Sequence, residues 1–179
     1  GLDIKLVRRP AKQGYINFIS DGEYVSEEQY YLYIEEDGIE ISASTPAGYF
    51  YALQTLRQIV ENNPDGKLPA CSMLDYPRFE YRGILIDVSR HFRSLDFLKR
   101  QIDMMARLKM NRLHLHLTDA AGWRMEIESY PRLTSYAAWR TPATWKEWWQ
   151  GGRQHVDEGT EGAYGGYYTK EELRDLVAY

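Results

Sequence analysis

Charged side chains follow two apolar segments of this 179-residue chain. Arg90 comes shortly after the run 83–88 (GILIDV), and Asp119 follows the alternating run 112–118 (RLHLHLT). A guanidinium presents a planar fork of donors that suits carboxylates or paired hydroxyls. A carboxylate can accept a hydrogen bond from a ligand hydroxyl or orient a histidine. The residue types alone leave two interpretations open, namely a ligand-binding pair or a buried structural ion pair.

Two histidines in the second of these segments raise the question of a metal. His114 and His116 are separated by one residue, so on a strand both imidazoles point the same way. The chain has 4 histidines in all, the others being His91 and His155. A structural zinc site normally takes about four ligands. We therefore favour hydrogen-bonded histidines over a metal site, and we expect no cofactor.

Tryptophans are concentrated in the part of the chain that follows Asp119. A flat indole face suits a sugar ring, which carries C–H bonds on one face and hydroxyls at its edge. Indoles also anchor long loops to a scaffold, and we expect that role for most of these residues. One or two of them could face a ligand. The residues concerned are Trp123, Trp139, Trp145, Trp148 and Trp149.

The elements that must position these side chains lie in residues 77–179. The run 83–88 is almost continuously apolar, which predicts a strand buried on both faces and hence a parallel sheet covered by helices. A helical stripe follows it, formed by Leu95, Leu98, Ile102, Met105 and Leu108. The segment 112–118 then predicts a second strand, with Leu113, Leu115 and Leu117 on one face. This order is a βαβ unit, and in α/β barrels reactive residues follow the carboxyl ends of the strands.

The last residues predict a helix that begins with a capping box over 169–172 (TKEE). Its apolar residues Leu173, Leu176 and Val177 have no following strand to cover them. Two parallel strands are marginal as an independent sheet. We therefore expect the chain to hold only the first βα units of a barrel.

Residues 1–76 predict a small α+β domain with a structural role. Strands are expected over 2–8, 30–35, 39–44 and 69–74. The pair Thr45-Pro46 predicts the start of a helix, because threonine caps and proline fits the first turn. We expect the apolar stripe of this helix to pack on one face of the sheet. The stripe is formed by Tyr49, Leu53, Leu56 and Val60.

The composition excludes several classes of protein. Hydrophobic residues make up 44% of the chain and the net charge is only −4, which together exclude intrinsic disorder and provide no basic footprint for nucleic acid. The sequence has no run of the ~20 apolar residues that a membrane span needs. The single cysteine, Cys71, excludes an internal disulfide.

Five ordered segments make the sequence resemble family 20 glycoside hydrolases, the β-N-acetylhexosaminidases. Residues 81–92 (YRGILIDVSRHF) resemble the first barrel strand of that family, and 109–119 (KMNRLHLHLTD) resemble the second. Residues 122–127 (GWRMEI), 130–134 (YPRLT) and 138–140 (AWR) continue the match in order. The domain before them is similar to the accessory domain that precedes this barrel. The resemblance covers nearly the whole chain.

The resemblance implies a (β/α)8 TIM barrel that removes terminal N-acetylglucosamine or N-acetylgalactosamine from glycans by substrate-assisted, retaining catalysis. Arg90 matches the arginine that grips the ring hydroxyls of the terminal sugar. Asp119 matches the aspartate that supports the acid/base through a later histidine. The adjacent Asp-Glu catalytic pair would lie beyond Tyr179, so we expect these 179 residues alone to be inactive. The resemblance also implies an extracytoplasmic location.

One position departs from the family pattern. The family often has a second aspartate after Asp119, where this chain has Ala120. The role of Asp119 survives this change, whereas the role of the second carboxylate is lost. The pair Asp157-Glu158 lies in a glycine-rich loop, so we discount it as the catalytic pair. Two alternatives remain, a metal-dependent barrel hydrolase that uses His114 and His116 or a non-catalytic carbohydrate-binding fragment.

Overall fold

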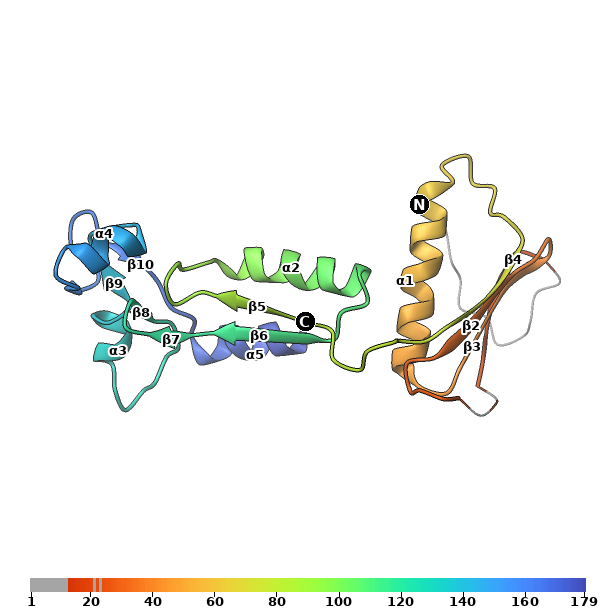
Figure 1. Cartoon of the computed structure of the whole chain (residues 1–179), viewed down its shortest axis with the longest axis horizontal. Helices are drawn as coiled ribbons and strands as arrows, with labels where there is room; N and C mark the ends of the chain where they lie inside the picture. Colours follow the sequence, from red (N-terminus) through yellow and green to blue (C-terminus); the bar gives the residue numbers. More distant parts are fainter. Residues whose placement is uncertain (1–12, 21, 23) are drawn as a thin grey trace. The chain divides into compact units, whose positions relative to one another are not determined.

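The computed structural model describes residues 13–20, 22 and 24–179, which form parts of two compact units. Unit 1 is Gly1–Glu80 and unit 2 is Tyr81–Tyr179 (Figure 1). This division lies close to the expected border between residues 76 and 77. The strand expected over 2–8 lies outside the described residues.

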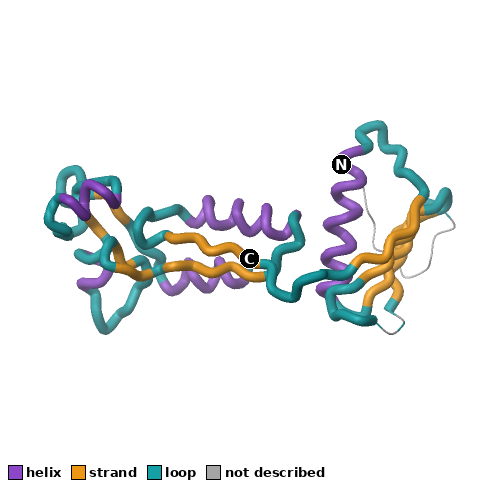
Figure 2. Tube along the Cα trace, viewed as in Figure 1, coloured by secondary structure: helices purple, strands orange, loops and turns teal. Residues whose placement is uncertain are grey.

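The described part of unit 1 is a four-stranded sheet covered by one helix (Figure 2). The strands are β1 (Tyr15–Ile19), β2 (Tyr30–Ile34), β3 (Gly38–Ala43) and β4 (Cys71–Asp75), in the order β1-β3-β2-β4. The pairing is parallel between β1 and β3 and antiparallel between β2 and each of its neighbours. The predicted α+β arrangement with the helix on one face is confirmed, because buried residues of β2 and β3 share a core with the helix.

Helix α1 (Pro46–Asn62) begins as its sequence predicts, and Tyr49, Leu56 and Val60 of its expected stripe lie in or against the core. The hydroxyl of Thr45 accepts a hydrogen bond from the Gly48 amide at 3.3 Å, which caps the helix. The prediction for Leu53 was wrong, since its side chain is 39% exposed. The buried face is formed by Gly48, Tyr51, Ala52 and Leu56. Gly48 lies so close to the neighbouring backbone that an added Cβ would approach the carbonyl oxygen of Gln29 to 2.6 Å. The contact therefore forms where the helix has small residues, and Leu53 lies to one side of it.

Unit 2 begins with the predicted strand–helix–strand unit. It consists of β5 (Gly83–Asp87), α2 (Leu95–Arg107) and β6 (Arg112–His116), and the two strands are parallel. The register places Ile86 beside Leu115 and Asp87 beside His116. The hydroxyl of Ser94 caps α2 by accepting a hydrogen bond from the amide of Phe97.

Helices α2 and α5 (Lys170–Ala178) pack against the side of the β5–β6 sheet that carries Ile86 and Leu115 (Figure 1). The capping box of α5 is confirmed, with Thr169 and Glu172 bonded reciprocally. The expectation that the apolar face of α5 is uncovered was wrong for Leu173 and Leu176, because both join the core around Val88, Leu98 and Tyr168. Val177 is the exception and remains 89% exposed.

Two further expectations about apolar residues in unit 2 were wrong. Leu85 is 57% exposed, because alternate residues of β5 point away from α2 and α5 and no described segment covers that side. Leu108 is 63% exposed, since α2 ends at Arg107 and the chain turns there through Lys109 at φ 56°. The helix buries Leu98 and Met105 instead.

The segment after β6 is a chain of short elements rather than an irregular loop. The expected strand 112–118 ends at His116, and Thr118 belongs to a separate antiparallel hairpin. This hairpin comprises β7 (Thr118–Asp119) and β8 (Gly122–Trp123). The elements that follow are α3 (Arg132–Ser135), β9 (Trp139–Arg140), α4 (Trp145–Gln150) and β10 (Tyr164–Gly165). Strands β9 and β10 pair with each other in antiparallel orientation.

Candidate active site

The candidate site lies where β5 and β6 end. Asp87 is the last residue of β5 and is paired in register with His116, the last residue of β6. Arg90 follows β5 by three residues, and Asp119 stands in β7 just beyond β6. Parallel strands bring their carboxyl ends to one edge of the sheet, which is where barrel enzymes carry their reactive groups.

Arg90 joins two carboxylates at this edge. Its Nη2 donates to Asp119 Oδ2 at 2.7 Å, and its Nη1 donates to Asp87 Oδ2. The side chain of Arg90 is 42% exposed and that of Asp119 is 33% exposed. The predicted proximity of Arg90 and Asp119 is therefore present. Neither side chain is buried within the described residues, whereas the alternative interpretation was a buried structural ion pair.

Asp87 fixes the turn that carries Arg90. Its Oδ1 accepts hydrogen bonds from the amides of Ser89 and Arg90, each at 3.0 Å. Burial raises the pKa of Asp87, but these bonds and the Arg90 guanidinium outweigh it and leave that pKa below its ordinary value. The hydrogen bond that Arg90 donates to the Asp87 carboxylate, together with the negative charge of that carboxylate, raises the pKa of Arg90. Sequence reasoning missed this role, although an aspartate two and three residues before its amide partners is a usual turn signal.

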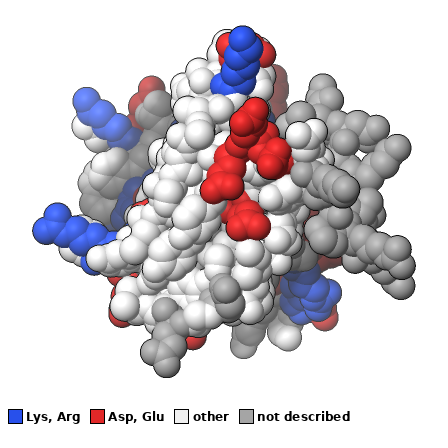
Figure 3. All heavy atoms as spheres, turned by 90° about the vertical axis from the view of Figure 1, so that its right-hand side faces the viewer, with Lys and Arg blue, Asp and Glu red and all other residues white. Residues whose placement is uncertain are grey.

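His116 belongs to the same cluster, whereas His114 does not. The Nε2 of His116 lies 3.3 Å from Asp119 Oδ2 and 3.2 Å from the carbonyl oxygen of Thr118. His114 lies earlier on β6 and is exposed. The metal hypothesis gains no support, because the part of the chain that is described contains no group of three His, Cys, Asp or Glu side chains able to hold an ion. The acidic side chains that gather on the face drawn in Figure 3 form no such group either.

Two fully buried arginines lie behind the site. Arg124 donates to the carbonyl oxygens of Val88 at 3.0 Å and Ser89 at 2.7 Å, and it also reaches Ala138 and Gly166. Burial and, after it, the charge of the second arginine, Arg140, lower the pKa of Arg124 to about 10. Arg124 therefore remains charged at neutral pH. Sequence reasoning predicted no role for either arginine, because hydrogen bonds to distant backbone carbonyls follow no periodic pattern of residue types.

His91 lies next to Arg90 and close to these cations. Burial lowers the pKa of His91, and the charges of Arg93, Arg140 and Arg124 lower it further. Its ring lies 5.4 Å from that of Tyr164. The neutral imidazole is therefore favoured beside the site.

The tryptophans divide as expected into packing residues and exposed ones. Trp148 is 2% exposed, and the indole nitrogens of Trp123 and Trp139 donate to backbone carbonyls at 2.6 and 2.8 Å. Trp145 and Trp149 are 40% and 44% exposed, and their rings stack on each other at 5.3 Å. Only this last pair leaves indole surface in solvent on α4.

Two other residues named in the sequence analysis have clear environments. Ala120 donates its amide to Asp119 Oδ1 at 2.6 Å and presents a methyl group where the family often has a second carboxylate. Asp157 is 71% exposed, lies between α4 and β10, and has Arg132 at 3.9 Å. Asp157-Glu158 does not follow a strand of the β5–β6 sheet and does not take part in the site.

Comparison with known proteins agrees with this geometry. A parallel βαβ unit with charged residues past its strands is the repeating unit of α/β folds, barrels among them. The model of the glycosyl hydrolase family 20 catalytic domain matches residues 79–179, and that of family 20 domain 2 matches residues 1–76. The chain therefore belongs to glycosyl hydrolase family 20.

The relatives of this chain are much longer proteins. A beta-hexosaminidase of Vibrio furnissii is 39% identical over 163 residues, which are 87% of this chain and 24% of that protein. A family 20 exo β-N-acetylglucosaminidase of Vibrio harveyi, solved with N-acetylglucosamine, has a TM-score of 0.77 at 38% identity, covering 92% of this chain and 25% of that one. A mutant beta-hexosaminidase of Streptomyces plicatus, solved with its product, has a TM-score of 0.73 at 35% identity, covering 93% and 32%. This chain spans about a quarter of the length of the first of these relatives.

Proposed function

We propose that the protein carrying this chain is a β-N-acetylhexosaminidase that removes terminal N-acetylglucosamine or N-acetylgalactosamine from glycans. The observation that supports this most directly is the Arg90 guanidinium, held between Asp87 and Asp119 with its edge open at the carboxyl ends of two parallel strands. A cation fixed on one side and accessible on the other is suited to donate to neighbouring hydroxyls of one sugar ring. Membership of family 20 supports the same assignment.

The reaction would use the acetamido group of the substrate. Its carbonyl oxygen bonds to the anomeric carbon while the glycosidic C–O bond breaks, and a carboxylic acid of the enzyme protonates the leaving oxygen. Water then attacks the anomeric carbon, the same carboxylate takes the proton, and the bond to the acetamide oxygen breaks. Two inversions at one carbon retain its configuration.

The described residues would hold the sugar rather than transfer the proton. Arg90 would grip the ring hydroxyls, and Asp119 would orient a histidine that serves the acid/base. We assign the acid/base itself to none of the described residues.

An extracytoplasmic location is part of this proposal. No helix within residues 13–20, 22 and 24–179 is long and apolar enough to cross a membrane.

The test compares two aryl glycosides on a protein that joins this chain to the rest of a family 20 catalytic domain. Aryl N-acetyl-β-glucosaminide should be hydrolysed with retention at the anomeric carbon. Aryl β-glucoside, which has a hydroxyl in place of the acetamido group, should not be turned over. Equal turnover of the two would refute substrate-assisted catalysis, and turnover of neither would refute the proposed activity.

A further inference from the structure

Arg140 connects the two segments that carry Arg90 and Asp119. It stands in β9 and is completely buried. Its Nη2 donates to the carbonyl oxygen of Arg90 at 2.7 Å, and its Nη1 donates to that of Ala121 at 3.1 Å. Ala121 follows Asp119 by two residues in the β7–β8 hairpin. One rigid guanidinium therefore ties the main chain of both partners in the accessible ion pair.

The other contacts of Arg140 keep this guanidinium in place. Its Nε donates to the carbonyl of Pro142 at 2.9 Å, and Nη2 also reaches that of Ala143 at 3.1 Å. The rings of Trp148 and Tyr164 lie 6.0 and 5.5 Å from its central carbon. Within the described residues its hydrogen-bond acceptors are all backbone carbonyls, and no carboxylate pairs with it. Its charge therefore serves to hold the main chain rather than to form an ion pair.

Arg124 does not duplicate this tie. It holds the carbonyls of Val88 and Ser89, which lie before Arg90, and its side chain donates no hydrogen bond to the 119–121 segment within the described residues. The hydroxyl of Ser89 does connect the two segments a second time, by donating to the carbonyl of Gly122 at 2.7 Å. This bond uses a single donor, whereas Arg140 spans two carbonyls with a planar group.

We propose that Arg140 is a positioning residue that sets the separation between the Arg90 guanidinium and the Asp119 carboxylate. Without it, the carbonyls of Arg90 and Ala121 lose the donor they share, and the turn after β5 can move relative to the β7–β8 hairpin. The consequence for ligand binding rests on the proposed function, because it assumes that this pair holds a sugar. The effect of Arg140 on the distance between Arg90 and Asp119 does not depend on the proposed function.

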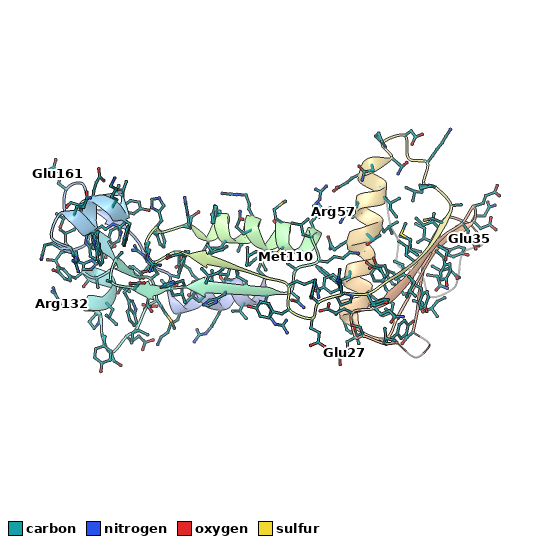
Figure 4. All side chains as sticks on the ribbon, in the orientation of Figure 1. Glu27, Glu35, Arg57, Met110, Arg132 and Glu161 are labelled. Atoms are coloured by element: carbon teal, nitrogen blue, oxygen red, sulfur yellow. The ribbon has the colours of Figure 1, made fainter. Side chains whose placement is uncertain are left out.

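The test uses Arg140→Lys in the protein with a complete family 20 catalytic domain. A lysine keeps the charge, but its single ammonium lacks the fork that reaches both carbonyls. Arg132→Met is the matched control, since Arg132 stands on α3 in the same loop region with 72% of its side chain exposed (Figure 4). We expect Arg140→Lys to weaken the binding of N-acetylglucosamine about tenfold by calorimetry. We expect Arg132→Met to leave it unchanged.

A double-mutant cycle separates positioning from a general loss of structure. If Arg140 acts through Arg90, Arg140→Lys should cause no further loss of sugar affinity in an Arg90→Ala background. Losses that multiply in the double variant would overturn the proposal. If Arg140→Lys does not fold, Ser89→Ala replaces it in the same cycle, because it removes the other tie between the two segments and leaves the buried guanidinium of Arg140 in place.

A crystal structure of the variant distinguishes this inference from the proposed function. Absence of sugar binding by the unaltered protein would refute the proposed function alone. The inference is then judged by geometry, and it predicts that Arg90 and Asp119 separate beyond hydrogen-bond distance in Arg140→Lys. An unchanged pair in that structure would overturn the inference even if the protein is an active hexosaminidase.

Discussion

Asp87→Asn should weaken sugar binding although Asp87 is not expected to touch the sugar. The asparagine oxygen can still accept from the amides of Ser89 and Arg90, which now meet Asp87 Oδ1 at 3.0 Å. The other carboxylate oxygen, which receives Arg90 Nη1, becomes an amide nitrogen. Two donors then face each other, so the guanidinium loses one of its two fixed partners.

The magnitude follows from the freedom that Arg90 regains. Holding one long side chain in a single rotamer on binding costs about 0.5–1.5 kcal/mol, and every 1.4 kcal/mol is tenfold in affinity. Because Asp119 still holds Nη2, we expect affinity for N-acetylglucosamine to fall about two- to tenfold, measured by calorimetry. Asp157→Asn is the control, since that carboxylate is 71% exposed and outside the site. Unchanged affinity in a folded Asp87→Asn variant would refute the reasoning.

The same variant should show a defined pH dependence of stability. The folded pKa of Asp87 lies below its ordinary value of 3.8, so the ionised form is favoured by folding. Its contribution to the free energy of unfolding is therefore complete above that ordinary value and is lost as the pH falls through the folded pKa. Urea unfolding should show a constant difference between the two proteins from about pH 8 to about pH 5, which shrinks in stronger acid. A difference that grows with acid would contradict this sign.

Three further predictions concern the site, the metal hypothesis and unit 1. Arg90→Ala should lower kcat/KM for an aryl N-acetyl-β-glucosaminide by roughly tenfold or more, and an unchanged value in a folded variant would make Arg90 a structural ion only. Activity should survive exhaustive chelation, whereas inactivation that zinc alone reverses would favour the metal hypothesis. Gly48→Ala should destabilise unit 1 by about 1–3 kcal/mol in urea, because its Cβ would meet the carbonyl of Gln29 at 2.6 Å and the Cβ of Ala43 at 2.8 Å. The exposed Leu53→Ala is its control, and an equal loss of stability in the two variants would count against the packing argument.

The sequence predicted the elements whose causes are local. Thr45 and Thr169 cap helices because the groups they bond lie three residues away. The βαβ unit was also predictable, because its two strands and its helix each carry a distinct pattern of apolar residues. The predicted apolar stripes were wrong at Leu53 and Leu108. The exposure of Leu53 depends on which side of its helix meets a neighbour, and that of Leu108 depends on where its helix ends. Periodicity carries no information on either point.

The site was predictable only in part, for a related reason. The barrel rule places Arg90 and Asp119 at the same edge of the sheet, and the structure shows that their side chains are in contact there at 2.7 Å. The support behind them depends on hydrogen bonds between positions far apart in the chain, such as that from Arg140 to the Arg90 carbonyl. Every residue has a backbone carbonyl, so the residue type does not indicate which carbonyl accepts the hydrogen bond. These partners are therefore identified only from the structure.

This difference explains how the accessible ion pair stays in place. Arg90 and Asp119 must remain exposed to meet a ligand, so their own contact is screened by water and contributes little rigidity. The rigidity comes from groups that water does not reach, namely the guanidiniums of Arg124 and Arg140 on backbone carbonyls. A buried cation without a carboxylate is costly unless its donors are satisfied, and here the carbonyls of the site segments satisfy them. Movement of these segments would leave buried donors without acceptors, and that cost holds the binding side chains in position.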